Sequence, residues 1–399
     1  DLATRSHRDS SSSSSLGELD FSPELVETYF VWASVWAFGG ALLVDKSKNH
    51  KDHFSRWWLE ENKTVKFPVE TSVFDVMVDE KKNELVPWTY GDYVHMPGEP
   101  VNNLYVDVPE TSRLTYLFNL LVHNHHGVMY VGNAGTGKTV CMQNNIKALD
   151  EDDYVYAFMN LNSETDSLTL QTIMEGLLEK KAGITFGPPG NKHIVYYIDD
   201  LNMPFVDKYN TQEPIAFLRC FSDYELTYER EKLGPRKVKN CDIVTSMNPT
   251  AGSFVVDGRF QRQFATFSCQ LPPGESLTII FGSILDAHLQ DFDSEMIPVG
   301  KAVGAAAGEL QAAVADTFLP SAVKFHYIFN LRDISNVFGG LLRSESRFCS
   351  QPNVLVELML HEQNRVYRDR LIQEQDIRRF DAMLEEICKK HFGSIEGCE

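Results

Sequence analysis

The sequence predicts an α/β domain, in which a parallel sheet is flanked by helices, followed by an all-helical subdomain. Three observations predict it. Between about residues 103 and 270, short apolar runs alternate with segments of helical periodicity, which is typical of parallel sheets with crossover helices. A glycine-rich loop joins one of these runs to the helix after it. Beyond Pro272, only helical periodicity remains.

The composition excludes several classes of protein. The chain has 399 residues, of which 43% are hydrophobic, so it can bury a sizeable core. Its net charge of -19 argues against a nucleic-acid surface, which needs clustered Lys and Arg. The seven cysteines form no C-x-x-C pair, so we expect free thiols in a cytoplasmic protein.

The first 95 residues have a different character from the rest. Residues 1–20 contain a serine run among charges and are expected to be a flexible linker. A helix is predicted from Pro23. The apolar run 29–44 is short for a membrane span and contains a Gly pair, so we expect a buried helix and no membrane partner. Two further runs, 74–78 and 85–88, predict a hairpin. An aromatic set predicts a packed helical core: Trp32, Trp36, Phe54, Trp57, Trp58 and Phe67.

The elements of the α/β domain follow from the same periodicities. Strands are expected at 128–131, 154–160, 194–198, 242–246 and 264–267, and helices at 111–124, 139–149 and 168–178. In the helical part, helices are expected at 277–289, 301–318, 331–342 and 354–380. No internal repeat at a fixed period is present.

The loop after the strand at 128–131 carries the clearest chemistry. It matches the phosphate-loop pattern G-x-x-x-x-G-K-[ST] at every fixed position, between an apolar strand and a helix. Its glycines allow backbone N–H groups to face phosphates, Lys138 reaches the β- and γ-phosphates, and the Thr139 hydroxyl ligates Mg²⁺. The sequence therefore predicts a site for ATP or ADP with Mg²⁺, whose residues are Gly132, Asn133, Ala134, Gly135, Thr136, Gly137, Lys138 and Thr139.

Polar residues follow two other expected strands. The run 195–198 ends in Asp199 and Asp200. Such a strand end can place Asp199 beside the magnesium and Asp200 where it orients or deprotonates water. Asn248, after the strand at 242–246, can hold the attacking water or the γ-phosphate; taken alone, an Asn-Pro turn explains it equally well.

Three arginines complete the candidate set. Arg259 and Arg262 could act as an arginine finger toward a neighbouring module, or form surface salt bridges. Arg332 opens a helix of the helical part and could reach the phosphates, or pair with Asp333. The histidines at 123, 125 and 126 suggest a metal by their spacing, but no acidic or Cys residue adjoins them, so no metal is expected there.

These features together resemble an AAA+ ATPase. The amino-acid sequences of several segments are more specific. They closely resemble an axonemal dynein heavy chain, most of all the third ATPase module of an outer-arm chain, and the resemblance runs from about Phe21 to the end. The segments are WAFGG at 36–40, FSRWW at 54–58, KTVKFP at 63–68, VGNAGTGK at 131–138, YIDDLNMP at 197–204, DKY at 207–209, MNPT at 247–250, KFHY at 324–327 and FNLRD at 329–333.

The resemblance implies a piece of a larger motor with six such modules in a ring. Residues 21–95 would be the end of the preceding module and a junction, 96–270 the large nucleotide-binding domain, and 271–399 the helical lid. The partners would be neighbouring modules, with dynein intermediate and light chains and microtubules reached only through the parent chain, in a ciliary or flagellar axoneme. In the family, the third site regulates microtubule release.

One residue departs from the AAA+ pattern. The second acidic residue is usually Glu, and here it is Asp200. The shorter side chain lies about one methylene further from the water, and a displacement of about 1 Å can cost 10²-fold in rate. Slow hydrolysis is therefore expected. Two alternatives are a ring spacer that holds nucleotide permanently, and a stand-alone ATPase or remodeller.

Overall fold

The computed structural model describes residues 22–43, 48–68, 72–89, 104–249, 255–349 and 351–393. The expected linker, residues 1–20, lies outside these ranges. The chain forms two compact units. Unit 1 contains residues 1–89, 113–133 and 141–270, and unit 2 contains 90–112, 134–140 and 271–399.

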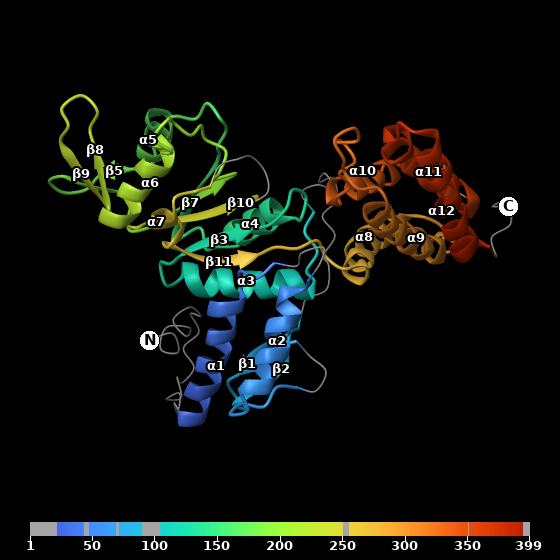
Figure 1. Cartoon of the computed structure of the whole chain (residues 1–399), viewed down its shortest axis with the longest axis horizontal. Helices are drawn as coiled ribbons and strands as arrows, with labels where there is room; N and C mark the ends of the chain where they lie inside the picture. The colour runs from blue at the N-terminus through green and yellow to red at the C-terminus, as the bar shows by residue number, and fades with distance from the viewer. Residues whose placement is uncertain are drawn as a thin grey trace. The chain divides into compact units, whose positions relative to one another are not determined.

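A five-stranded parallel sheet forms the centre of unit 1 (Figure 1). Its strands are β3 (Gly127–Val131), β4 (Tyr154–Asn160), β7 (His193–Asp199), β10 (Cys241–Met247) and β11 (Phe264–Ser268). Their order across the sheet is β11-β3-β10-β7-β4, and every neighbouring pair is parallel. All five expected strands are confirmed. The first strand, β3, lies beside the last two, which creates a switch point where ligands of such sheets bind at the carboxyl ends.

Helices cover both faces of this sheet because alternate strand residues point to opposite sides. On one face, Met129 and Tyr196 belong to a core shared with α5 (Ser167–Glu175) and α6 (Glu213–Tyr224). On the other face, the Tyr130 hydroxyl donates to the Leu114 carbonyl of α3 (Pro109–Val122). Asn145 of α4 (Lys138–Lys147) donates to the same hydroxyl. The large domain is therefore a helix–sheet–helix sandwich, as expected.

The N-terminal segment packs as helices and a hairpin. α1 (Pro23–Gly39) begins where Ser22 accepts a hydrogen bond from the Leu25 N–H, and α2 (His50–Glu61) follows. β1 (Val76–Asp79) and β2 (Glu84–Pro87) form the expected antiparallel hairpin. The expected aromatic core is present in part: Trp32, Trp36 and Trp58 are buried, whereas Trp57 is exposed. The Trp36 ring lies 5.4 Å from Phe74 and 6.1 Å from Phe267 of β11. The hydrophobic effect therefore attaches this segment to the sheet.

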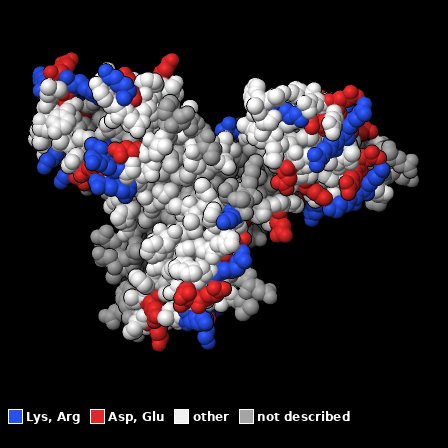
Figure 2. All heavy atoms as spheres, in the orientation of Figure 1, with Lys and Arg blue, Asp and Glu red and all other residues white. Residues whose placement is uncertain are grey.

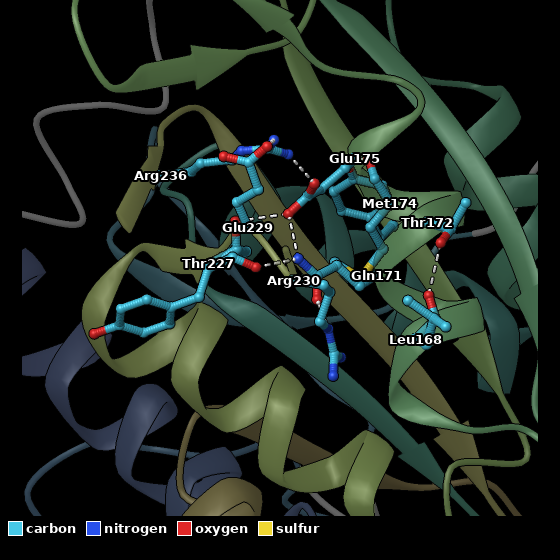
Figure 3. Close-up of polar contacts among 11 residues, drawn as sticks. Leu168, Gln171, Thr172, Met174, Glu175, Thr227, Glu229, Arg230 and Arg236 are labelled. Carbon is cyan, nitrogen blue, oxygen red and sulfur yellow. Dashed lines mark hydrogen bonds and ion pairs between the residues drawn. The ribbon is translucent and has the colours of Figure 1, made fainter. Parts of the chain in front are cut away.

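A second, four-stranded sheet in unit 1 was not predicted. It is ordered β5-β6-β9-β8 and consists of Glu179–Lys180, Thr185–Gly187, Pro235–Val238 and Leu226–Tyr228, respectively. These strands are too short to show a period. Figure 3 shows polar contacts that attach two of them, β8 and β9, to α5: Glu175 accepts from Thr227 at 2.8 Å and from Arg236 at 2.5 Å. Arg236 also pairs with Glu229.

Unit 2 contains a helical bundle (Figure 1). Its helices are α8 (Gly274–His288), α9 (Met296–Thr317), α10 (Leu331–Leu341), α11 (Pro352–Val366) and α12 (Glu374–Phe392), with short 3₁₀ turns at Leu289–Asp291 and Arg368–Arg370. One continuous apolar core joins all five helices and includes Phe338, Met359 and Phe380. The described residues beyond 272 contain no strand, as expected.

The single helix expected at 354–380 is wrong. The chain leaves the helical path after Val366, turns at 368–370 and starts α12 at Glu374. Neither Pro nor Gly marks the break. Tertiary contacts cause it, because Arg370 donates to the carbonyls of His326 and Ile328, and Arg368 pairs with Asp381 on the far side of the turn.

Charged side chains of both signs lie on the surface of the chain. Figure 2 shows Lys and Arg interspersed with Asp and Glu on the visible face. No described helix is both long and apolar enough to span a bilayer. The six cysteines in the described part of the chain are free thiols, as expected.

Candidate nucleotide-binding site

The glycines of the phosphate loop have the backbone that the loop needs. The loop leaves β3 at Val131, and the Gly132 N–H donates to the Met247 carbonyl at 3.2 Å, which extends the β3–β10 pairing by one residue. Gly135 and Gly137 have φ values of +75° and +86°, a region that favours glycine. Successive N–H groups in such a loop form an anion-binding concavity. Lys138, the first residue of α4, is buried.

The carboxylate expected to bind magnesium is fixed by its neighbours. Asp199, the last residue of β7, is buried, and its carboxylate accepts a hydrogen bond from the Ser246 hydroxyl on β10. The hydroxyl oxygens of Tyr197 and Ser246 lie 3.0 Å apart. The Asp200 N–H also donates to Asp199 at 3.0 Å. Asp199 is therefore pre-oriented, and Ser246 and Tyr197 are functional candidates that the sequence reasoning missed.

The next two candidates occupy the same edge of the sheet. Asp200 is exposed and has a φ of +54°, which is unusual outside glycine, although Asp tolerates it. Backbone strain of this kind concentrates at functional sites. Asn248 is buried, and its carbonyl accepts a hydrogen bond from the Asn202 side chain at 3.0 Å. Leu201 N–H donates to the Ser246 carbonyl, so the ends of β7 and β10 are joined directly.

In unit 2, the phosphate loop lies against the start of α10. The Leu331 N–H donates to the Gly135 carbonyl at 3.3 Å. A Cβ placed on Gly135 would lie 2.4 Å from the Asn330 side chain, so any larger residue would force Asn330 to shift. Asn330 is also the N-cap of α10, where its side chain accepts from the Arg332 N–H. The residue that starts α10 thus also contacts the loop.

Arg332 does not form the ion pair that was its alternative explanation. Asp333 accepts from Arg370 at 2.5 Å and from the Asn330 N–H at 2.8 Å, which completes a capping box. Arg332 is exposed, two residues from Asn330. Arg370 is the structural partner, which sequence spacing could not reveal because 37 residues separate it from Asp333.

The two finger candidates differ in their surroundings. Arg259 lies in α7 (Gly258–Gln261) and Arg262 directly follows it, and both side chains are exposed. Arg262 pairs with Asp223 at 3.1 Å, which is the salt bridge considered as its alternative role. Among the described residues, no ion pair involves the Arg259 side chain.

The expected nucleotide-site residues are divided between the units. Gly132, Asn133, Asp199, Asp200 and Asn248 belong to unit 1, whereas residues 134–140 and Arg332 belong to unit 2. A parallel sheet in this order, a phosphate loop after its first strand, an acidic end to its third strand and a following helical bundle define the class of AAA+ P-loop NTPases.

Comparisons with known proteins identify the family within this class. Residues 93–272 match the model of the P-loop containing dynein motor region, 303–398 the AAA+ lid domain, and 4–90 the dynein heavy chain AAA lid domain. The chain is 42% identical over 94% of its length to the dynein beta chain of the flagellar outer arm of Chlamydomonas reinhardtii. It is 42% identical over 94% to the ciliary dynein beta chain of Tripneustes gratilla, and 41% over 93% to human dynein axonemal heavy chain 17.

This chain belongs to the dynein heavy chain family. It spans 8% of the length of each of these relatives.

Proposed function

We propose that this chain binds ATP or ADP with Mg²⁺ as a regulatory AAA+ module of a ciliary or flagellar dynein heavy chain. The observation that carries the proposal is the phosphate loop, with its two positive-φ glycines, in a chain whose third sheet strand ends in the buried, oriented Asp199. Residues 132–139 would hold the phosphates, and Thr139 and Asp199 the magnesium. A phosphate loop between a buried strand and a helix is the structural context in which this motif binds nucleotide.

Hydrolysis at this site is proposed to be slow. Asp200 would orient or deprotonate the water, Asn248 would position it or the γ-phosphate, and Arg332 would contact the γ-phosphate. The contact between α10 and Gly135 supports the role of Arg332, because it fixes the helix start beside the loop. Aspartate at 200 reaches less far than the usual glutamate, which lowers the rate without weakening binding.

Residues 1–20 would form a linker, 21–95 the end of the preceding module and a junction, 96–270 the large domain and 271–399 the lid. Nucleotide exchange would change the angle between large domain and lid, which neighbouring modules would sense. Arg259 is the better candidate for the finger toward the preceding module, since Arg262 is paired with Asp223. Intermediate chains, light chains and microtubules would be reached through the parent heavy chain, in the axoneme.

Nucleotide binding and turnover by the 399-residue chain test the proposal. Lys138→Ala should abolish binding of a fluorescent ADP analogue, whereas Lys147→Ala, at the exposed end of the same helix, should not. Unchanged affinity in Lys138→Ala would refute the nucleotide site. Asp200→Glu should raise the hydrolysis rate and leave affinity unchanged. A wild-type chain that never exchanges its ADP, with no gain in Asp200→Glu, would favour the permanent spacer.

A further inference from the structure

A second cluster of chemically active side chains lies at the amino edge of the same sheet, opposite the nucleotide candidates. It consists of His125, just before β3, His193, the first residue of β7, and Asp242, the second residue of β10. Because β10 lies between β3 and β7, these three residues lie at or just before the starts of neighbouring strands. The sequence showed no acidic residue beside His125, and the expectation of no acidic partner is wrong. The parallel pairing of β3 and β10 places Asp242, 117 residues further along the chain, next to His125.

The donor atoms of the three residues converge. The Asp242 carboxylate oxygen Oδ2 lies 3.1 Å from Nδ1 of His125 and 3.9 Å from Nδ1 of His193. One ligand atom from each residue lies within 4.8 Å of the other two. Ligands of a tetrahedral Zn²⁺ ion, bound at about 2.0–2.1 Å, are about 3.3 Å apart. The observed separations therefore need only small side-chain adjustments to surround an ion.

The environment of His193 gives an independent reason for a ligand. Its Nδ1 atom is buried and has no hydrogen-bond partner among the described residues. A buried polar atom without a hydrogen-bond partner is rare and requires an explanation. A bound ion is one such explanation.

The cluster is also held in place and accessible. The two imidazole rings stack with centroids 4.2 Å apart and an interplanar angle of 14°, so both Nδ1 atoms face Asp242 together. His125 is fixed in a turn at a φ of +59°, where its N–H donates to the Val122 carbonyl. The cluster lines a hollow of about 360 Å³ in unit 1, which gives an ion and its water ligands a path in.

We propose that His125, His193 and Asp242 form a binding site for a divalent transition-metal ion such as Zn²⁺. Two imidazole nitrogens and one carboxylate oxygen suit Zn²⁺, whereas Mg²⁺ and Ca²⁺ prefer oxygen ligands. Three protein ligands leave a fourth position for water. The ion would link the turn before β3 to β7 and β10, and so stabilise the central strands of the sheet.

Zn²⁺ titration of the metal-stripped 399-residue chain, with Mg²⁺-ADP saturating, tests the proposal. We expect one tight site, and a loss of affinity of at least about tenfold in His193→Ala and in the isosteric Asp242→Asn. His123→Ala removes an exposed histidine two residues from His125 and should change nothing. Equal Zn²⁺ affinity in all four chains would overturn the site.

A measurement on the wild-type chain keeps the test valid if a variant fails to fold. X-ray absorption of the chain loaded with one equivalent of Zn²⁺ should show imidazole nitrogen and oxygen ligands and no sulfur. Sulfur in the first shell would mean that the free thiols bind the ion, and would overturn the proposal. So would a spectrum without imidazole scattering.

Discussion

The hydroxyl of Ser246, on β10, donates a hydrogen bond to the carboxylate of Asp199, at the end of β7. The two residues lie on adjacent parallel strands, 47 residues apart in the chain. The bond fixes a carboxylate that is proposed to bind magnesium. Residues that orient metal ligands typically change metal affinity by about 10–100-fold when they are removed.

We therefore expect Ser246→Ala to raise the Mg²⁺ concentration needed for half-maximal nucleotide binding by about tenfold. A Mg²⁺ titration with a fluorescent ADP analogue measures it. Thr245→Val is the control, since the Thr245 hydroxyl is equally buried but donates to the Ile198 carbonyl. Equal shifts in both variants would show that the effect is general destabilisation and not orientation of Asp199.

Gly135→Ala should weaken nucleotide binding beyond detection. The new methyl group would lie 2.4 Å from the Asn330 side chain. The alanine would also have to keep a φ of +75°. Gly190→Ala separates the two causes, because Gly190 also has positive φ but has no atom within 4 Å of the added Cβ. A left-handed alanine alone costs about 1–2 kcal/mol. Thermal unfolding should therefore show a larger loss for Gly135→Ala than for Gly190→Ala.

Substitutions of Arg370 and Arg332 should have different effects, the first on folding stability and the second on nucleotide binding. Arg370→Ala removes the cation that Asp333 contacts at the start of α10, and we expect a loss of about 1.5–3 kcal/mol in unfolding free energy. Arg332→Ala should leave stability unchanged and weaken ATP binding relative to ADP. Urea unfolding and nucleotide competition measure the two effects. Loss of stability in Arg332→Ala would contradict the assignment.

The stability of unit 1 should depend on pH through Lys51. Burial, and then repulsion by Arg113, lowers the pKa of Lys51 from its ordinary 10.5 to about 8. Between these two values the unfolded chain binds more protons than the folded chain, so stability rises with pH through this window. Below about pH 8, the folded chain carries the full cost of a desolvated charge.

Lys51→Met removes this cost. The variant should be more stable than the wild type at pH 7, by at most about 3.5 kcal/mol, since one pKa unit is about 1.4 kcal/mol and the shift is from 10.5 to about 8. The difference should shrink as pH rises from 8 to 10.5. Urea unfolding across this range measures it, with the exposed Lys48→Met as control. A difference that is constant with pH would contradict the desolvation of Lys51.

The sequence by itself determined the features that depend on local patterns. The phosphate loop, the five strands of the parallel sheet and the four expected helical segments of the lid all follow from residue spacing, although one of these segments proved to be two helices. The spacing of apolar residues shows which face of a helix or strand is buried, and this pattern is clearest in long elements. Asp199 and Asn248 could be named because they follow strands directly.

Only the tertiary structure decided which distant residues meet. Ser246 beside Asp199, Arg370 beside Asp333, the break between α11 and α12 and the cluster of His125, His193 and Asp242 all arise from contacts between separate elements. In the second sheet, β8 and β9 likewise meet Glu175 of α5 through Thr227 and Arg236. Such contacts depend on the order and register of the strands, which no local sequence pattern specifies. The free energy that selects the order and register comes from packing between elements, not from interactions within one element.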